Sequence, residues 1–119
     1  MKGNEEIMNK ALFIGRVVKD PNFKMTESID IAKFTLAVDR HSKDKTADFV
    51  NITAFSNLAD ICEKYLKKGQ LVYVEAYVKT GSYEKDNKKI YTTDFIASDV
   101  RILIWNSGKD KGEEQNEKK

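Results

Sequence analysis

Hydrophobic and polar residues alternate along several stretches of this chain, which is the pattern of β-strands with one buried face. One side of the run Asp48–Phe55 is aliphatic and consists of Val50, Ile52 and Ala54. Its other side carries Phe49, Asn51, Thr53 and Phe55, because successive side chains of a strand point to opposite faces. The aliphatic side is the predicted core face, so two phenylalanines are expected on an outward, polar surface.

Four further strands are predicted at Lys10–Lys19, Ile29–Arg40, Leu71–Lys79 and Ile90–Trp105. The first is apolar on both sides, so we expect one side to face the core and the other a second surface, such as another subunit. Gly15 in its middle is predicted to mark a bulge or a bend. Leu71–Lys79 also places tyrosines outward, at Tyr73 and Tyr77, and the favoured interpretation is that a helix or a neighbouring subunit covers them.

One helix is predicted at Asn57–Lys68, where apolar residues recur at helical spacing. Ser56 or Asn57 can cap its start, and Gly69 can close its end. The connecting segments are a turn at Asp20–Asn22, a polar loop at Arg40–Ala47 and an exposed hairpin tip at Thr80–Lys89. Five strands with a helix between the third and the fourth are typical of an all-β OB-fold, a five-stranded Greek-key barrel, although other small barrels share this order.

The composition excludes several classes of protein but does not by itself indicate a function. The 119 residues form one domain, with 40% hydrophobic and 34% charged residues. The net charge of +2 is too small to indicate a nucleic-acid partner by itself. A single cysteine, Cys62, excludes an internal disulfide and a cysteine-rich zinc site, and it is predicted to be buried on the helix. No apolar run exceeds four residues, so neither a membrane span nor a signal peptide is predicted, and a cytoplasmic location is expected.

The sequence contains no recognisable set of catalytic residues. His41 is the only histidine and lies in a polar loop, and the glycines are scattered rather than gathered in a phosphate loop. Asp94 and Asp99 are five positions apart on a predicted strand and therefore face opposite sides. We predict neither an enzyme nor a metal site nor a cofactor.

The outward aromatics lie between lysines, an arrangement on which bases can stack while cations hold phosphates. For Phe49 and Phe55 the alternative is packing at a subunit interface. For Tyr83 in the hairpin the structural alternative is cross-strand pairing with Tyr91, which is compatible with stacking. Trp105, at the end of the last strand, is interpreted as a packing residue.

Several fragments together resemble the bacterial single-stranded DNA-binding protein family. They are Met8-Asn9-Lys10 with Leu12 to Arg16, Lys19-Asp20-Pro21, Ala32 to Val38, Asp48 to Phe55, Tyr65 to Gly69, Thr80 to Tyr83 and Tyr91 to Thr93. The resemblance covers roughly Met8 to Leu103, and the order and spacing of the fragments are more specific than any one of them.

The resemblance implies a homotetramer, a dimer of dimers whose first strands pair between subunits, and sequence-independent binding of single-stranded DNA in replication, recombination and repair. It places base stacking on Phe49, Phe55 and Tyr83. Phosphate contacts are expected from Lys10, Arg16, Lys24, Lys33, Arg40, Lys43 and Lys79. The protein is then expected in the cytoplasm, associated with the nucleoid.

The expected organisation is a flexible extension at residues 1–7, the OB-fold domain at 8–105 and a disordered polar tail at 106–119. Family members usually end in a short acidic tip with a terminal hydrophobic residue. The ending Glu114–Lys119 lacks both, so recruitment of repair or replication proteins by that route is not expected. The stacking tryptophan common in the family has no counterpart at His41-Ser42.

Two other function classes are compatible with an OB-fold. One is a protein-interaction module of a primosome-like replication complex, which predicts weak DNA affinity and tight partner capture. The other is a nuclease, which needs clustered carboxylates with a divalent cation. The outward acids of this sequence supply no such cluster.

Overall fold

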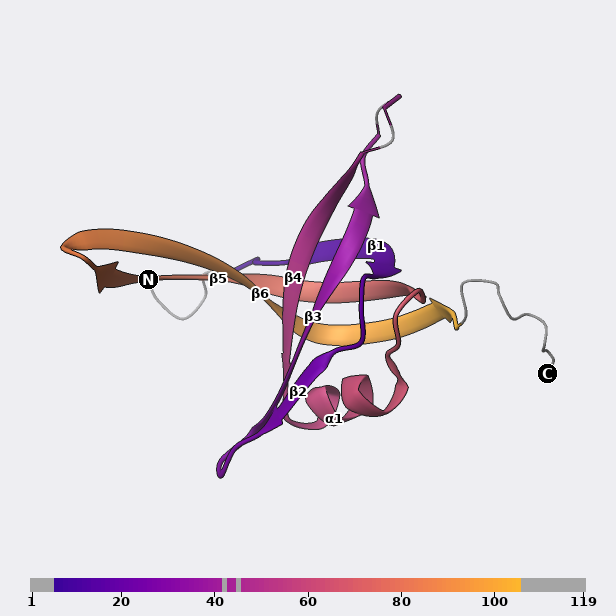
Figure 1. The fold of residues 1–119 in the computed structure, drawn as a ribbon, viewed down its shortest axis with the longest axis horizontal. Helices are drawn as coiled ribbons and strands as arrows, with labels where there is room; N and C mark the ends of the chain where they lie inside the picture. Colours follow the sequence, from indigo (N-terminus) through magenta and orange to yellow (C-terminus); the bar gives the residue numbers. More distant parts are fainter. Residues whose placement is uncertain (1–5, 42, 45, 106–119) are drawn as a thin grey trace.

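The computed structural model describes residues 6–41, 43–44 and 46–105, which form six strands and one helix (Figure 1). The strands are β1 (Ala11–Val17), β2 (Asn22–Met25), β3 (Asp30–Asp39), β4 (Ala47–Phe55), β5 (Leu71–Lys85) and β6 (Lys88–Ile104), and α1 (Ser56–Tyr65) lies between β4 and β5. The sheet order is β1-β5-β6-β4-β3-β2, and a further pairing of β1 with β3 closes it into a barrel. The predicted OB-fold is confirmed.

The short strand β2 is the element that the pattern does not predict. The sequence indicates a turn at Asp20–Asn22, whereas Asn22 begins a strand that pairs antiparallel with β3. Four residues are too few to show an alternation of polar and apolar positions. With β2 counted, the helix follows the fourth strand instead of the third.

The core is built from one face of each long strand and from α1, which covers one end of the barrel (Figure 1). Its buried members are Val17, Ala32, Phe34, Leu36, Ile52, Ala54, Ala59, Cys62, Leu66, Val72, Val74, Ala76 and Ala97. The alternation predicted for β3, β4 and β5 is therefore confirmed. Cys62 is fully buried, and burial raises the pKa of its thiol to about 12, as expected for a packing residue.

Gly15 has a different role from the predicted bulge. β1 pairs with β5 from Ala11 to Arg16 without a register shift. A Cβ atom at Gly15 would lie 2.6 Å from the backbone oxygen of Ala37 on β3. The glycine is needed because two backbones approach closely where β1 leaves β5 and reaches β3.

The helix is shorter than the predicted Asn57–Lys68. Phe55 precedes its first residue and no side chain caps it, so neither Ser56 nor Asn57 has the predicted role. A helix end is defined by the groups that satisfy its free backbone atoms. At the start of α1 no side chain satisfies the free backbone amides, and at its end the Tyr65 carbonyl is satisfied by a residue outside the helix.

Gln70 sets that end. Its side chain is buried, its Nε2 donates to the Tyr65 carbonyl at 3.0 Å, and its Oε1 accepts from the Lys67 amide at 2.9 Å. Gly69 turns the chain with a φ of 91°, and its amide donates to the Val17 carbonyl at 2.8 Å. The Gln70 side chain thus takes the place of a further helical turn, and the Gly69 amide ties the segment after the helix to β1.

β5 and β6 continue as a two-stranded arm that projects from the barrel (Figure 1). Most of the predicted tip, Thr80–Lys89, is strand, and only Asp86 and Asn87 turn, with φ of 53° and 64°. Asp and Asn tolerate these left-handed angles in two-residue hairpin turns. Both sides of the arm carry polar residues, so its strands lack the alternation of apolar and polar positions that predicts a strand with one buried face.

The segment before β1 is held to β5 by Asn9. Its Nδ2 donates to the Val78 carbonyl at 2.8 Å and its Oδ1 accepts from the Val78 amide at 2.9 Å. Of the predicted N-terminal extension, residues 1–5 lie outside the described residues, as does the whole predicted tail 106–119. Within the described part of the chain, no helix is long and apolar enough to cross a membrane.

Candidate nucleic-acid interface

The outward face of β3 and β4 carries the aromatics that the sequence places outside. Phe49 is 66% exposed and Phe55 36% exposed, at the two ends of the same strand face. Between them lie Asn51 and Thr53, and Thr53 is paired with Lys33 on β3. The face is therefore polar and basic in its middle and aromatic at both ends.

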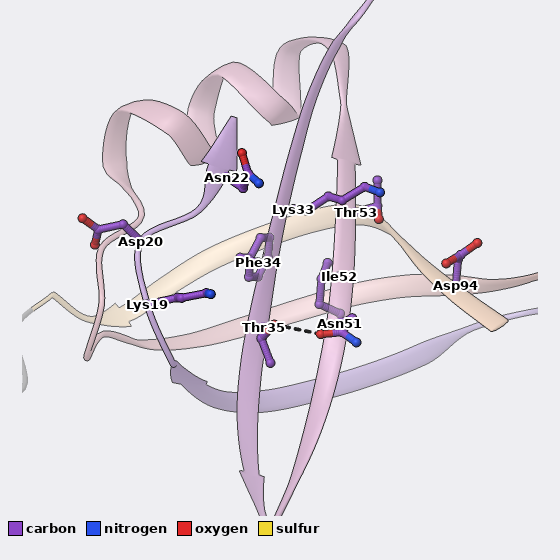
Figure 2. Close-up of a pocket in the computed structure, with 10 residues that line it drawn as sticks. All are labelled: Lys19, Asp20, Asn22, Lys33, Phe34, Thr35, Asn51, Ile52, Thr53 and Asp94. Carbon is purple, nitrogen blue, oxygen red and sulfur yellow. Dashed lines mark hydrogen bonds between the residues drawn. The ribbon is translucent and has the colours of Figure 1, made fainter. Parts of the chain in front are cut away.

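Three adjoining hollows run along this face, and Lys33 lines all of them. Their volumes are 340, 200 and 220 Å³. Figure 2 shows the first, in which Lys33 and Thr53 lie between Asn22 of β2 and Asp94 of β6. We call these three hollows the groove. It is lined by residues of β2, β3, β4, β5 and β6, and an extended chain several residues long fits such a shape better than a compact ligand does.

The charge of the groove is mainly positive. Lys24 lines its second hollow, Lys79 its third, and Lys19 its first, together with Lys33 in all three. Asp20 and Asp94 are the acids in its lining. The structure thus brings together three of the seven predicted phosphate-contacting cations and adds Lys19.

The four remaining predicted cations lie outside the groove. Lys10 forms an ion pair with Glu75 at 2.7 Å, and Arg40 forms one with Asp48 at 2.8 Å. Hydrogen bonds from these cations hold the pKa values of both carboxyls below their usual range. Such exposed pairs remain accessible to a competing phosphate.

Arg16 and Lys43 complete the predicted set. Arg16 donates from Nη1 to the Gly69 carbonyl at 3.0 Å, on the β1 side of the barrel. Lys43 is exposed in the loop between β3 and β4. Neither lines the groove.

Phe55 lines the third hollow next to Lys79, and the arm continues from there. Tyr83 is two alternations beyond Lys79 on β5, so both side chains are on the same face of the arm. Tyr83 is 52% exposed and opposite Ile90, whereas Tyr91 is opposite Ser82. The two tyrosines therefore face opposite sides, and the alternative of cross-strand pairing between them is wrong.

Sequence reasoning missed the polar lining of the groove. The missed residues are Lys19, Asp20, Asn22, Thr35, Asn51, Thr53 and Asp94. The Thr35 hydroxyl donates to Asn51 Oδ1 at 2.8 Å, as Figure 2 shows. Alternation placed Asn51 and Thr53 outward, but only the pairing of β4 with β6 brings Asp94 beside them.

A second outward surface lies on β1 and β5. Leu12 and Ile14 are 57% and 54% exposed, and with Tyr73 they line a hollow of 690 Å³. Tyr73 is half-buried and donates to Glu75 at 3.3 Å, while Tyr77 is 42% exposed. β1 therefore has one face in the core and an apolar face outside, as its sequence predicts.

The described residues were also compared with the requirements of a metal site. Among the described residues, no group of three or more His, Cys, Asp or Glu side chains is arranged to hold a metal ion. His41 is exposed in the β3–β4 loop and lines the hollow on the β1 side, away from the groove.

The sequence of this chain matches a family model over residues 8–103, and that model describes the single-strand binding protein family. The chain belongs to this family. The match spans the barrel and the arm together, so it includes every strand that builds the groove.

Relatives and a solved structure agree with this assignment. Single-stranded DNA-binding protein 3 of Clostridium acetobutylicum is 40% identical over 106 residues, which cover 84% of this chain and 74% of the relative. Single-stranded DNA-binding protein 1 of Staphylococcus aureus (strain Mu50) is 36% identical over 103 residues, covering 82% and 66%. The solved structure of Plasmodium falciparum SSB in complex with ssDNA superimposes with a TM-score of 0.73 at 29% identity, covering 85% of this chain and 99% of that one.

Proposed function

We propose that this protein binds single-stranded DNA without sequence preference and protects it during replication, recombination and repair. The observation that carries the proposal is the groove itself, where Lys33 lines three adjoining hollows and Phe55 lines the last of them. Family membership and the likeness to a protein solved with ssDNA support the same ligand. The chemistry is stoichiometric, since stacking and charge neutralisation need neither a catalyst nor a cofactor.

Each group in and around the groove has a part in this proposal. Phe49, Phe55 and Tyr83 stack bases, since all three rings are exposed: Phe55 lines the groove, Phe49 lies at the other end of the same face of β4, and Tyr83 lies on the face of β5 that carries Lys79. Lys24, Lys33 and Lys79 contact phosphates, and Lys10, Arg16, Arg40 and Lys43 extend the basic path outside the groove. Stacking does not distinguish strongly between bases, because every base has a π-face. The proposed binding domain is residues 8–105.

We further propose that the protein is a homotetramer, a dimer of dimers, in the cytoplasm and associated with the nucleoid. Leu12 and Ile14 are more than half exposed beside the 690 Å³ hollow, and a second copy of β1 would remove this apolar surface from water. Ile14→Glu should lower the mass measured by sedimentation. Met25→Glu is the matched control, because Met25 is 74% exposed on β2, away from that face. Equal masses for both variants and the wild type would contradict the proposed interface.

Fluorescence anisotropy of labelled oligo-dT, with a duplex competitor and at two salt concentrations, tests the main function. We expect tight binding to the single strand only, with log K falling by about 0.7 per phosphate contact for each tenfold rise in salt. Phe49→Ala should weaken binding about tenfold, since one aromatic–base stack is typically worth ~1–3 kcal/mol.

The same titration separates this function from its alternatives. Unchanged affinity of Phe49→Ala together with a loss of tetramers would assign Phe49 to a subunit interface. Absence of binding at low salt would favour a protein-interaction module of a primosome-like complex. Cleavage of the oligonucleotide with a divalent cation would indicate a nuclease.

A further inference from the structure

A second pair of exposed aromatics lies outside the groove. The rings of Tyr65, at the end of α1, and Trp105, just after β6, meet edge to face with centroids 6.1 Å apart at 87°. Tyr65 is 47% exposed and Trp105 is 55% exposed, so the predicted packing of Trp105 is only partial. Neither residue lines any of the three hollows.

Three lysines lie close to Tyr65 along the chain. Lys64 precedes Tyr65 in the last turn of α1, and Lys67 and Lys68 follow it in the connection to β5. All three are exposed, and none forms an ion pair with another described residue. This connection lies beside Trp105, because Leu71 at its end is paired with Ile104. Exposed rings next to unpaired ammonium groups are the two components of a single-strand site.

We infer that Tyr65 and Trp105, with Lys64, Lys67 and Lys68, form a second stacking site that takes a base of single-stranded DNA after the strand has left the groove. The inference rests on the proposed function and extends the path of the strand over the α1 end of the barrel. An edge-to-face pair leaves ring faces uncovered for a base. Phosphates on either side of that base meet the lysines.

The contribution of Ile61 to binding distinguishes a single-stranded DNA ligand from a protein partner. It is 45% exposed on α1, one turn before Tyr65, and together with Tyr65, Trp105 and the 45%-exposed Ile104 it makes the surface partly apolar. A protein partner would bury the aliphatic and aromatic side chains alike. A stacked base needs only the rings, and three lysines favour a polyanion.

The chain offers a direct reporter, because Trp105 is its only tryptophan and the proposed groove aromatics are Phe and Tyr. A base stacked on an indole ring quenches its emission. The wild-type protein is titrated with oligo-dT of increasing length, and anisotropy of the labelled DNA and tryptophan emission are recorded together. We expect short oligonucleotides to bind without quenching and longer ones to quench.

Variants test the contacts. Trp105→Ala should weaken binding of the long oligonucleotides about tenfold and leave the short ones unchanged. Trp105→Phe should keep most of the affinity, and Ile61→Ala, the matched control, should keep all of it. Lys67→Gln with Lys68→Gln should lower the salt dependence for long oligonucleotides only.

Binding seen by anisotropy without any change in tryptophan emission at any length would overturn the second site and leave the proposed function intact. Equal losses for Ile61→Ala and Trp105→Ala would also overturn it and favour a protein-docking surface. Absence of binding by anisotropy would overturn both proposals.

Discussion

Lys79 of β5 and Asp94 of β6 are paired positions, and both side chains line the hollow beside Phe55. Asp94 also lines the hollow of Figure 2, which Lys33 shares. A carboxylate thus lies between two of the lysines of a groove that is mainly basic. Because it repels phosphate, Asp94 limits the affinity that the neighbouring lysines provide.

Asp94→Asn should therefore strengthen binding of oligo-dT. We expect a gain of about twofold to fivefold at low salt, the range of a single exposed charge interaction, and a smaller gain at high salt because ions screen it. Anisotropy titrations at both salt concentrations measure the change. Glu27→Gln is the matched control, since Glu27 is exposed in the turn between β2 and β3 and does not line the groove. Weaker binding by Asp94→Asn would mean that its carboxylate positions a lysine.

The two tyrosines of the arm form an internal comparison. Tyr83 shares a face with Lys79, whereas Tyr91 lies on the other face, with the Lys89 ammonium 5.8 Å from its ring centroid. Tyr83→Ala should weaken binding about tenfold and Tyr91→Ala should leave it unchanged. Anisotropy measures both, and sedimentation checks that neither substitution changes the mass of the protein in solution. Equal effects of the two substitutions would contradict a one-sided path along the arm.

Asp30 predicts a pH-dependent stability. A hydrogen bond with Asp60 raises the pKa of Asp30, so the folded protein holds this proton more tightly than the unfolded chain does. Ionised Asp30 therefore lowers the free energy of unfolding at pH values above its raised pKa. This loss is absent at pH values below the pKa of Asp in the unfolded chain, about 3.9. Asp30→Asn should melt at a higher temperature than the wild type at neutral pH, and the two should converge under acid conditions.

Thermal unfolding between pH 3 and pH 7 checks this expectation. Asp39→Asn, at the other end of β3, is the control for loss of one negative charge. A constant difference between Asp30→Asn and the wild type at every pH would show that the effect is not the titration of Asp30.

Substitution of Gln70 should lower the free energy of unfolding through lost hydrogen bonds, an effect that helix propensities do not describe. Gln70→Ala leaves the Tyr65 carbonyl and the Lys67 amide without their partner, which typically costs about 1–3 kcal/mol of unfolding free energy. Asn57→Ala, where the structure has no capping bond, should stay within about 0.5 kcal/mol of the wild type. Denaturant unfolding measures both. A loss for Asn57→Ala as large as that for Gln70→Ala would contradict the assignment of the helix end to Gln70.

The long alternating strands were predictable because burial on one face leaves a periodic trace in the sequence. The outward placement of Phe49 and Phe55 follows from the buried positions of Ile52 and Ala54, and the structure confirms it. The base-stacking role of these rings stays a prediction.

The missed features depend on contacts between distant segments. Asp94 enters the groove through the parallel pairing of Ile52 with Phe95, which no local pattern records. In the sequence Gln70 is indistinguishable from a loop residue, and only the structure shows that its side chain caps the helix. The strands of the arm were missed because neither of their faces is buried.

The hydrogen bonds between Asn9 and Val78 join residues 69 positions apart, and β1 pairs with β5 over a similar separation. During synthesis at about 5–20 residues per second, β1 leaves the ribosome roughly 3 to 14 seconds before the strand that it must pair with. Phe13 and Val17, whose side chains pack in the core of the folded barrel, stay unprotected on the nascent chain throughout that interval. The order of the strands thus sets a period in which a second nascent chain or a chaperone competes for β1 before the barrel can close.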